Sequence, residues 1–479
     1  MELYTAPMKT PLALLALFLI AVPARALEWQ TIGPRALGMG GAGVAMPQGP
    51  LNAYWNPAGL GMRGNTSGVQ MPFSAHAALT GDVLEGANDL EHIAKNPTAY
   101  TQADVVSALN KINQPGSGLR LDGSFFPALK IKKFAVFLNA SVHLGAAPFA
   151  DFSQTAPNTI GTLNNSKLII RGIQLAEFGV GYGQELPFAP GLLVGGNLKI
   201  MSGQVGYYNF LVAQNSSESN DLLRKLKEGS KTSSNFGVDL GALWDIDRTF
   251  DGVPMRPRVG VVGRNLNNPK FKQADAAVAA GAAGKFAVNP QVRFGVALSP
   301  LNWWHLAADL DMTKNLTPLD GRPSRQLSFG TEINAFNRSW LNIPLRAGIR
   351  RNVADNSKTM LSIGGGLNFA SALTDASLAW SPKKITTQSL GKNASIPAEF
   401  ALALSLSVLF GGGEEGRANA APADEPAAPA REWKAAPKAD DQPVPTEVIR
   451  KAAEKAHEDL KVEELKRAAP GEQPSATKP

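Results

Sequence analysis

Apolar and polar residues alternate along much of this sequence, most clearly at 397–410. One set of alternate positions is apolar: Phe400, Leu402, Leu404, Leu406, Val408 and Phe410. The other set is mostly small or polar: Glu399, Ala401, Ala403, Ser405 and Ser407. Successive strand residues point to opposite faces, so this segment predicts a strand with one apolar face. Its length suits a membrane-spanning strand of about 9–11 residues better than a soluble sandwich strand of about 5–6.

The same alternation recurs along the chain and predicts about fourteen strands. At 166–183 the apolar positions switch faces, which predicts a bulge near Gly172. We expect strands near 67–79, 118–129, 132–145, 166–183, 191–204, 232–246, 256–265, 290–299, 303–313, 324–335, 342–351, 357–369, 372–381 and 397–410.

The lengths of the links between these strands follow a rule. Links after even-numbered strands are mostly short, whereas most links after odd-numbered strands are long, 352–356 excepted. Outer-membrane barrels have short periplasmic turns and longer extracellular loops. The pattern therefore predicts an all-β, antiparallel outer-membrane β-barrel over 67–410. Two of the long links, 82–113 and 221–228, have helical patterns and are expected either to cap the extracellular mouth or to gate substrate entry.

The N-terminus predicts export. Lys9 precedes an apolar run from Leu12 to Val22, and Ala24 and Ala26 are small residues suited to a cleavage site. We therefore expect residues 1–26 to be a signal peptide. After Leu27 there is no apolar run of about 18 residues, which a transmembrane helix would need.

Two segments flank the expected barrel. Residues 27–66 are rich in Gly and Pro but also apolar, so we expect a hatch inside the lumen. Residues 411–479 are rich in Ala, Pro, Glu and Lys, which predicts a mostly disordered periplasmic tail. A helix is expected at 446–468 within that tail, either as a marginal element or as a docking site for a periplasmic partner.

Composition excludes several chemistries. The 479 residues contain no Cys, so disulfides, thiol nucleophiles and cysteine metal sites are impossible. The net charge of +7 is small and dispersed, which argues against a nucleic-acid partner. The five His have no metal-binding spacing, and His305 with Asp309 and Asp311 is best explained by lumen polarity. We expect no catalytic residues, metal or cofactor, but a lumen of mixed charge with these side chains: Arg171, Lys199, Arg264, Arg293, Arg346, Arg350, Asp239, Glu332 and Asp375.

A glycine-rich run in the expected hatch matches G-x-G-x-x-G: Gly38, Gly40, Gly41 and Gly43. A dinucleotide site also needs a preceding strand and an acidic residue about 20 positions later. No Asp or Glu occurs from Trp29 to Gly81, so we reject that interpretation. The glycines are expected to let backbone segments pack closely.

The run 33–45 followed by Tyr54-Trp-Asn-Pro-Ala-Gly-Leu60 resembles the start of FadL-like outer-membrane barrels. The sequence is most similar to their TraF-like branch, which also has a strand-end motif like Val259–Pro269. The resemblance covers about 29–410. It implies a fourteen-stranded barrel with Asn56, Pro57 and Ala58 in the hatch, and passage of hydrophobic molecules toward an opening in the wall.

Two functions are compatible with this sequence. The first is passive uptake of small hydrophobic molecules of fatty-acid or aromatic type across a Gram-negative outer membrane, whose lipid surrounds the barrel. The alternative is a non-transporting scaffold, or a secretion- or conjugation-associated barrel, whose tail binds a periplasmic protein. Neither function requires an enzyme.

Overall fold

The computed structural model describes residues 27–410 except 115–116, 213–221, 251, 317–322, 339, 355–358 and 390–391. The predicted signal peptide (1–26) and the predicted tail (411–479) with its helix at 446–468 lie outside the described residues.

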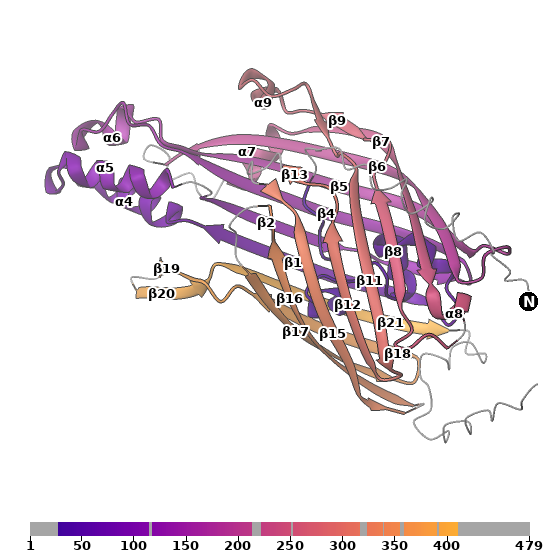
Figure 1. Cartoon of the computed structure of the whole chain (residues 1–479). Coiled ribbons are helices and arrows are strands. Elements are labelled where there is room, and N and C mark those ends of the chain that lie inside the picture. The colour runs from indigo at the N-terminus through magenta and orange to yellow at the C-terminus, as the bar shows by residue number, and fades with distance from the viewer. Residues whose placement is uncertain are drawn as a thin grey trace, which may run out of the picture. The chain divides into compact units, whose positions relative to one another are not determined.

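The wall is one closed antiparallel sheet (Figure 1). β1 (Ser67–Thr80) pairs with β21 (Glu399–Phe410) on one side and with β2 (Gly118–Phe125) and β3 (Ala128–Ile131) on the other. Because β2 and β3 both also pair with β4 (Phe134–Phe149), they are two halves of one barrel strand.

The fifteen strands therefore fill fourteen positions, which confirms the predicted barrel. The other wall strands, in chain order, are β5 (Lys167–Glu185), β6 (Leu192–Leu211), β7 (Lys231–Asp245), β8 (Arg258–Arg264), β11 (Gln291–Leu301), β12 (Trp304–Asp311), β15 (Gln326–Asn337), β16 (Leu341–Asn352), β17 (Thr359–Phe369) and β18 (Ala372–Trp380).

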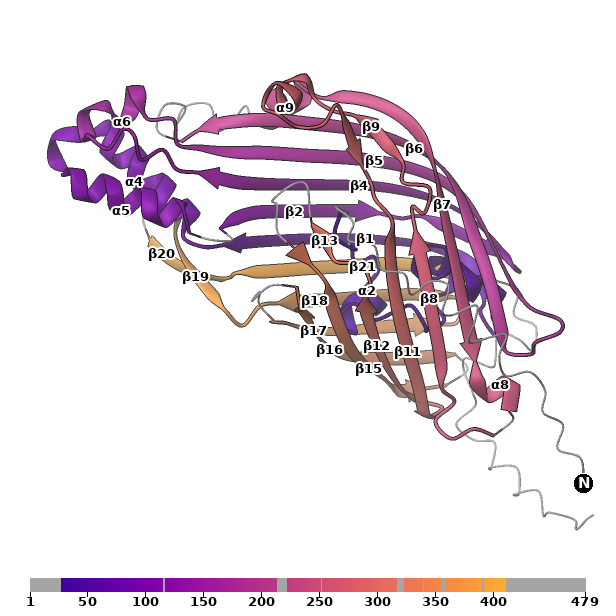
Figure 2. The same ribbon diagram turned by 45° about the horizontal axis from the view of Figure 1, so that its top comes forward.

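Most helices and all the accessory hairpins belong to the long links, which share one end of the barrel (Figure 2). The helices are α4 (Val83–Lys95), η3 (Pro97–Ala99), α5 (Gln102–Ile112), α6 (Pro157–Leu163), α7 (Leu222–Glu228) and α9 (Asp275–Ala279). The hairpins are β9 (Lys270–Lys272) with β10 (Lys285–Ala287), β13 (Asn315–Leu316) with β14 (Pro323–Ser324), and β19 (Lys384–Ser389) with β20 (Lys392–Pro397).

The helices predicted in the two long links are present. A capping box between Thr101 and Asp104 starts α5. α4 packs on both α5 and α6, and the three helices share a buried apolar cluster. α7 is the helix predicted in the second link. α8 (Ile246–Phe250) lies in the link between β7 and β8, at the opposite end of the barrel.

The prediction of a bulge near Gly172 is wrong. β5 pairs with both neighbours without a register shift from Lys167 to Glu185. The apolar positions change face because Ile173 and Leu175 belong to a buried apolar cluster inside the lumen, together with Phe271 and Phe286.

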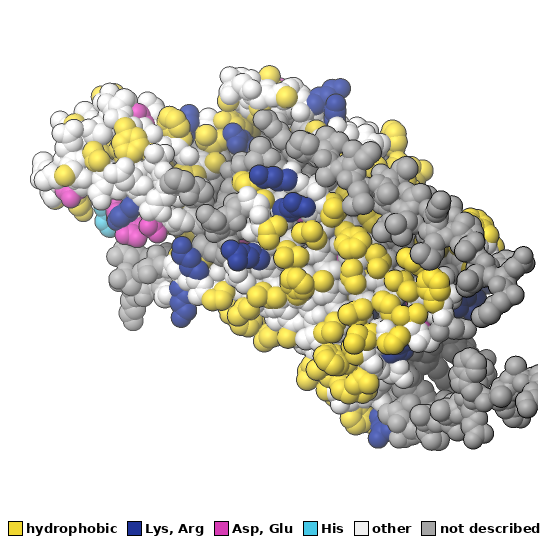
Figure 3. All heavy atoms as spheres, in the orientation of Figure 1, with side chains coloured by type: hydrophobic (Ala, Val, Ile, Leu, Met, Phe, Trp, Pro, Cys, Tyr) yellow, Lys and Arg dark blue, Asp and Glu magenta, His cyan; other side chains and the backbone are white. Residues whose placement is uncertain are grey.

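The two faces of the wall differ in chemistry. Large apolar side chains such as Phe134, Leu138, Leu198, Leu345 and Leu404 are exposed on the outer face, where Figure 3 shows a broad hydrophobic band. The buried polar residues on the strands occupy the alternate, inward positions. An apolar exterior and polar interior are the arrangement of a membrane β-barrel. Among the described residues, none of the helices combines the length and apolar character needed to cross a bilayer.

Residues 27–66 lie inside the barrel and are almost completely buried (Figure 2). They form α2 (Pro34–Gly38), η1 (Gly49–Leu51), α3 (Asn52–Trp55) and η2 (Pro57–Gly61), joined by turns. Their aromatic core of Trp29, Tyr54 and Trp55 packs against Phe126 and Phe137 of the wall. We call residues 27–66 the hatch.

Candidate functional site

The hatch rests on two places where the wall lacks side chains. The first is a row of three paired glycines, Gly183, Gly195 and Gly241, on β5, β6 and β7. A Cβ atom at Gly183 would lie 2.4 Å from the Pro57 carbonyl oxygen, and one at Gly195 would lie 2.5 Å from the same oxygen. Real Cβ atoms do not approach backbone this closely, so only glycine fits. We call this row the first glycine seat.

Asn56 links η2 to this seat. Its Oδ1 accepts a hydrogen bond of 3.1 Å from the Ala58 amide, which caps η2. Its Nδ2 donates to the carbonyl oxygens of Val44 and Ala242, at 3.2 and 3.1 Å. Asn56 is fully buried, and a Cβ at Gly241 would clash with its side chain. The Asn-Pro-Ala motif therefore joins two parts of the hatch to β7.

The second glycine seat is the directly opposed pair Gly330 on β15 and Gly348 on β16. A Cβ atom at Gly348 would lie 2.1 Å from the Gly40 amide nitrogen, and one at Gly330 would lie 2.3 Å from the Met39 carbonyl oxygen. Gly40 itself has a φ of 69°, which favours glycine. Its Cβ would also lie 2.6 Å from the Ile349 carbonyl oxygen.

The remaining predicted glycines also bring backbone groups to the wall. The Gly38 carbonyl accepts from the Ser362 hydroxyl at 3.0 Å, while the same hydroxyl accepts from the Gly40 amide. The Gly41 carbonyl accepts from Arg293. The Gly43 amide donates to Asp309 at 2.8 Å, and the neighbouring Val44 amide donates to the same carboxylate oxygen at 3.0 Å.

A buried ion network fixes α2. Arg35 forms two hydrogen bonds with the Glu332 carboxylate, at 2.9 and 2.5 Å. Arg346 donates to Glu332 at 2.6 Å and to Asp375 at 2.6 Å. The side chains of Glu332 and Arg346 are only 4% and 5% exposed, so each charge depends on these partners for compensation.

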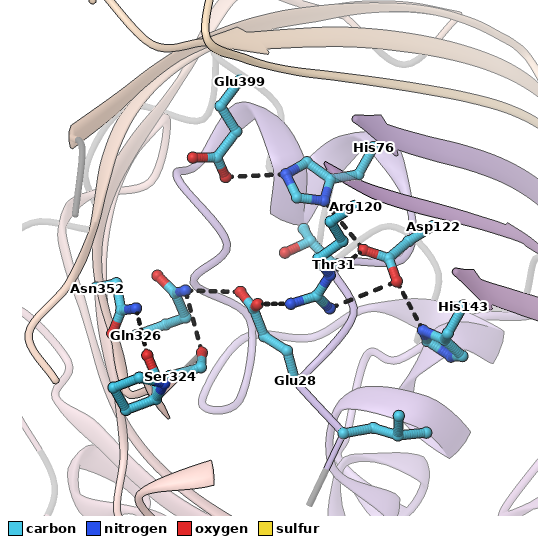
Figure 4. Close-up of polar contacts among 12 residues, drawn as sticks. Glu28, Thr31, His76, Arg120, Asp122, His143, Ser324, Gln326, Asn352 and Glu399 are labelled. Carbon is cyan, nitrogen blue, oxygen red and sulfur yellow. Dashed lines mark hydrogen bonds and ion pairs between the residues drawn. The ribbon is translucent and has the colours of Figure 1, made fainter. Parts of the chain in front are cut away.

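A second network fixes the start of the hatch (Figure 4). Glu28 accepts hydrogen bonds from Arg120 on β2 and from Gln326 on β15. Arg120 also pairs with Asp122, whose other contacts are His76 and His143. The network continues from His76 to Glu399 at 2.8 Å. Glu28 thus bridges opposite parts of the barrel wall.

Arginines also stack on the hatch aromatics. The Arg264 guanidinium lies 4.0 Å from the Tyr54 ring centroid, and that of Arg293 lies 4.6 Å from the Trp29 ring. Burial raises the pKa of Tyr54, an effect that the nearby Arg264 and Arg293 oppose. The Tyr54 hydroxyl donates to the Gln30 carbonyl oxygen at 2.6 Å.

Two small cavities beside the hatch are lined in part by polar side chains. A cavity of about 20 Å³ is lined by Arg120, His76 and Thr31, and one of about 30 Å³ by Asn139, Glu177 and Arg264, among others. Each has room for roughly one or two waters. In the described residues, no three His, Asp or Glu are arranged to hold a metal ion. Asp309 binds hatch amides and Asp311 pairs with Arg293 at 2.6 Å, as expected of a polar lumen.

Toward the helix-bearing end, one side of the lumen is apolar. Ile173, Leu175, Met201 and Val205 of β5 and β6 form a buried cluster with Phe271 of β9, and with Leu27, Phe286 and Val288. We call this the upper-lumen cluster. The Phe271 ring packs so closely on Gly203 that a Cβ there would lie 2.5 Å from it. The β9–β10 hairpin therefore covers an apolar stretch of the inner wall.

The wall ladder is interrupted beside this hairpin. β8 pairs with β7 only from Leu240 to Asp245. Farther along β7, the Val238 amide donates to Asn267 Oδ1 and Asn267 Nδ2 donates to the Phe236 carbonyl, at 2.9 and 2.8 Å. Asn265 and Asn268, with φ of 54° and 53°, turn the chain away from the strand direction. A loop and its side chains thus replace a strand partner here.

The closed antiparallel wall, with its apolar exterior and polar interior, defines the protein as an outer-membrane β-barrel. The chain belongs to the family described as "F plasmid transfer operon, TraF, protein", whose model matches residues 53–311. This match confirms the predicted TraF-like branch.

Solved structures similar to this chain include proteins described as transporters and channels. The toluene transporter TodX of P. putida is 13% identical with a TM-score of 0.47, over 81% of this chain and 100% of that chain. The toluene transporter TbuX of Ralstonia pickettii is 12% identical with a TM-score of 0.43, over 80% and 100%. A FadL homologue of Pseudomonas aeruginosa is 14% identical with a TM-score of 0.42, over 81% and 99%. No curated protein sequence matches the chain.

We predict that Asn56→Ala loosens η2. The change removes a buried acceptor and two donors, and a buried polar group left unpaired costs about 2 kcal/mol. Amide hydrogen exchange at Ala58 and Gly59 is expected to quicken by about thirtyfold. The matched control is Asn165→Ala, because Asn165 is exposed and lies in a link between wall strands, outside the hatch. Unchanged exchange in the Asn56 variant would contradict this role.

Proposed function

We propose that the protein is a passive outer-membrane channel for small hydrophobic molecules of fatty-acid or aromatic type. The observation that supports this function best is the upper-lumen cluster, which lies beside the interruption between β7 and β8. The lumen of a barrel is usually polar, so an apolar inner surface is suited to apolar ligands. The β9–β10 hairpin covers that surface with Phe271 and Phe286.

In this proposal the β9–β10 hairpin is the gate. When it moves, a hydrophobic molecule replaces Phe271 and Phe286 on Met201 and Val205, and can leave beside β7, beyond the end of β8. Residues 265–272 hold this route closed through a mixture of side-chain and backbone hydrogen bonds to β7, in place of a regular strand ladder. Transport follows the concentration gradient, with no covalent step. The hatch closes the rest of the lumen.

A reversible crosslink tests the gate. The Lys272 amide donates to the Ser233 hydroxyl at 2.8 Å, so Ser233→Cys with Lys272→Cys places two thiols side by side on the hairpin and β7. The chain has no other Cys. The control pair, Lys270→Cys with Ala287→Cys, joins directly paired residues within the hairpin and leaves it free of β7.

Uptake of labelled oleate and of toluene is measured in proteoliposomes before and after reduction. We expect the oxidised Ser233–Lys272 pair to lose at least nine-tenths of the uptake, reduction to restore it, and the control pair to transport throughout. Equal uptake in the oxidised and reduced states would reject the hairpin as the gate. No uptake of either compound above that of empty liposomes would reject the channel.

The alternative, a scaffold with a periplasmic partner, is proposed from the tail at 411–479. Deletion of these residues separates the two functions. A channel is expected to keep its oleate or toluene uptake without the tail. A scaffold is expected to lose a co-purifying periplasmic protein while the barrel still folds.

A further inference from the structure

The outer face carries a set of cations at the boundary of its apolar band. At the ends of β12, β15 and β16 the outward positions change from apolar to cationic within one step of the strand alternation, at or just beyond the strand terminus. Met312 is followed by Lys314, Leu327 is preceded by Arg325, and Ile349 is followed by Arg351. Lys314 and Arg351 are exposed and Arg325 is half-buried. We call these three residues the basic rim.

The strand pairing brings the basic rim together. Lys314 and Arg325 directly flank the paired residues Asn315 and Ser324 of β13 and β14. Arg351 pairs with Leu327, two residues from Arg325 on the same face. Diagonal neighbours of this kind have Cα atoms about 7–8 Å apart. The Arg325 Nε donates to the Asp311 carbonyl oxygen at 2.9 Å, which fixes the place of its guanidinium group. The cations of Lys314, Arg325 and Arg351 can therefore converge on one or two phosphate groups.

The basic rim occupies one side of the wall. Every outward position of β1–β7 in the described residues lacks Lys and Arg. Figure 3 shows Lys and Arg side chains along the edge of the hydrophobic band on the face that contains β12 and β15. No described Asp or Glu points outward beside the basic rim, since Asp311 is buried in the lumen. The adjoining segments 317–322 and 355–358 each contain one acidic and one basic residue, so they do not change the net charge.

The position of the basic rim along the membrane normal indicates which class of ligand it can bind. The basic rim lies at the end of the barrel that carries the long links, which is the extracellular end in proteins of this architecture. Directly next to it, Leu310, Leu327, Phe329 and Ile349 face outward. A cation set placed over an apolar surface matches a lipid with phosphate groups above acyl chains. Arg guanidinium groups bind phosphate through paired hydrogen bonds.

We propose that Lys314, Arg325 and Arg351 form a binding site for the phosphate groups of an outer-leaflet glycolipid, whose acyl chains lie on Leu310, Leu327 and Ile349. The site lies on the outside of the wall and does not depend on transport. It fixes one side of the barrel to a particular lipid and leaves the β1–β7 side without a charged lipid contact.

The test uses the full-length protein in phosphatidylcholine nanodiscs that contain labelled diphosphoryl lipid A. Lipid A without its phosphates is the second probe. The variant is Lys314→Gln, Arg325→Gln and Arg351→Gln together. The control variant is Lys132→Gln, Lys133→Gln and Arg338→Gln, which removes the same charge from exposed residues in the turns at the opposite end of the barrel. Circular dichroism confirms that both variants remain folded.

We expect the basic-rim variant to bind diphosphoryl lipid A about a hundredfold more weakly than the unmodified protein, because each cation near a membrane surface contributes about tenfold or less. The control variant is expected to bind normally, and the dephosphorylated lipid is expected to bind weakly to all three proteins. Equal affinity in the basic-rim variant, equal loss in the control, or displacement of the lipid by an equal concentration of inorganic phosphate would overturn the proposal.

Discussion

Gly348→Ala is expected to release the hatch from the second glycine seat while the barrel remains folded. The new Cβ would lie 2.1 Å from the Gly40 amide nitrogen and 2.4 Å from the Met39 carbonyl carbon. Both contacts are with backbone, which cannot rotate away as a flexible side chain would. Overpacking of this kind costs about 3 kcal/mol, which changes the equilibrium between seated and released hatch by about a hundredfold.

Trypsin measures this release, because Arg35 is protected while α2 lies against the wall. We expect cleavage after Arg35 to quicken by about the same factor and ion conductance to rise in planar bilayers. Gly123→Ala, on the wall strand β2, is the matched control because a Cβ there would meet nothing within 4 Å. A Gly348 variant as resistant to trypsin as this control would show that the seat does not hold the hatch.

Glu332→Ala is the second change with a large expected effect. The carboxylate accepts from Arg35 and Arg346, and its side chain is only 4% exposed. Its removal leaves the buried Arg346 and the half-buried Arg35 without that partner, and breaking a buried pair in this way costs about 3–5 kcal/mol. Asp375 still compensates Arg346, so we expect Arg35 and α2 to be the part that is released. Faster trypsin cleavage after Arg35 and a lower midpoint of thermal unfolding are the readouts.

A surface pair provides the comparison. Glu228 on α7 bonds to Arg224, and both side chains are more than half exposed. Glu228→Ala is therefore expected to cost less than about 1 kcal/mol, as exposed ion pairs do. Equal stability of the Glu332 and Glu228 variants would show that the buried ion network does not hold the hatch in place.

Strand alternation predicted the barrel well because lipid and lumen impose opposite demands on neighbouring residues. The prediction failed where that contrast is absent. Ile173 and Leu175 point inward yet are apolar, so the pattern at 166–183 suggested a bulge that β5 does not contain. The hatch glycines were expected to allow close backbone packing, and Gly40 does so.

The partners of the hatch were not predicted. Gly183 and Gly195 lie on consecutive strands, but these strands are far in the sequence from the hatch and from Gly348, and only the folded sheet places all three glycines against the hatch. The same holds for Glu28 and Arg120, which belong to separate segments. The motif at Val259–Pro269 was visible as a strand end. That Asn267 takes the place of a strand partner for β7 depends on the register, which the sequence alone does not define.

The two glycine seats have a consequence for biogenesis. The hatch leaves the ribosome before any strand, but the two glycine seats that it rests on belong to β5–β7 and to β15–β16, the latter near the opposite end of the chain. The hatch therefore cannot find its final position until most of the sheet has been laid down. The newly made polypeptide must reach the membrane before the hatch has taken up its final position. The last strands must then assemble around the hatch before β1 pairs with β21.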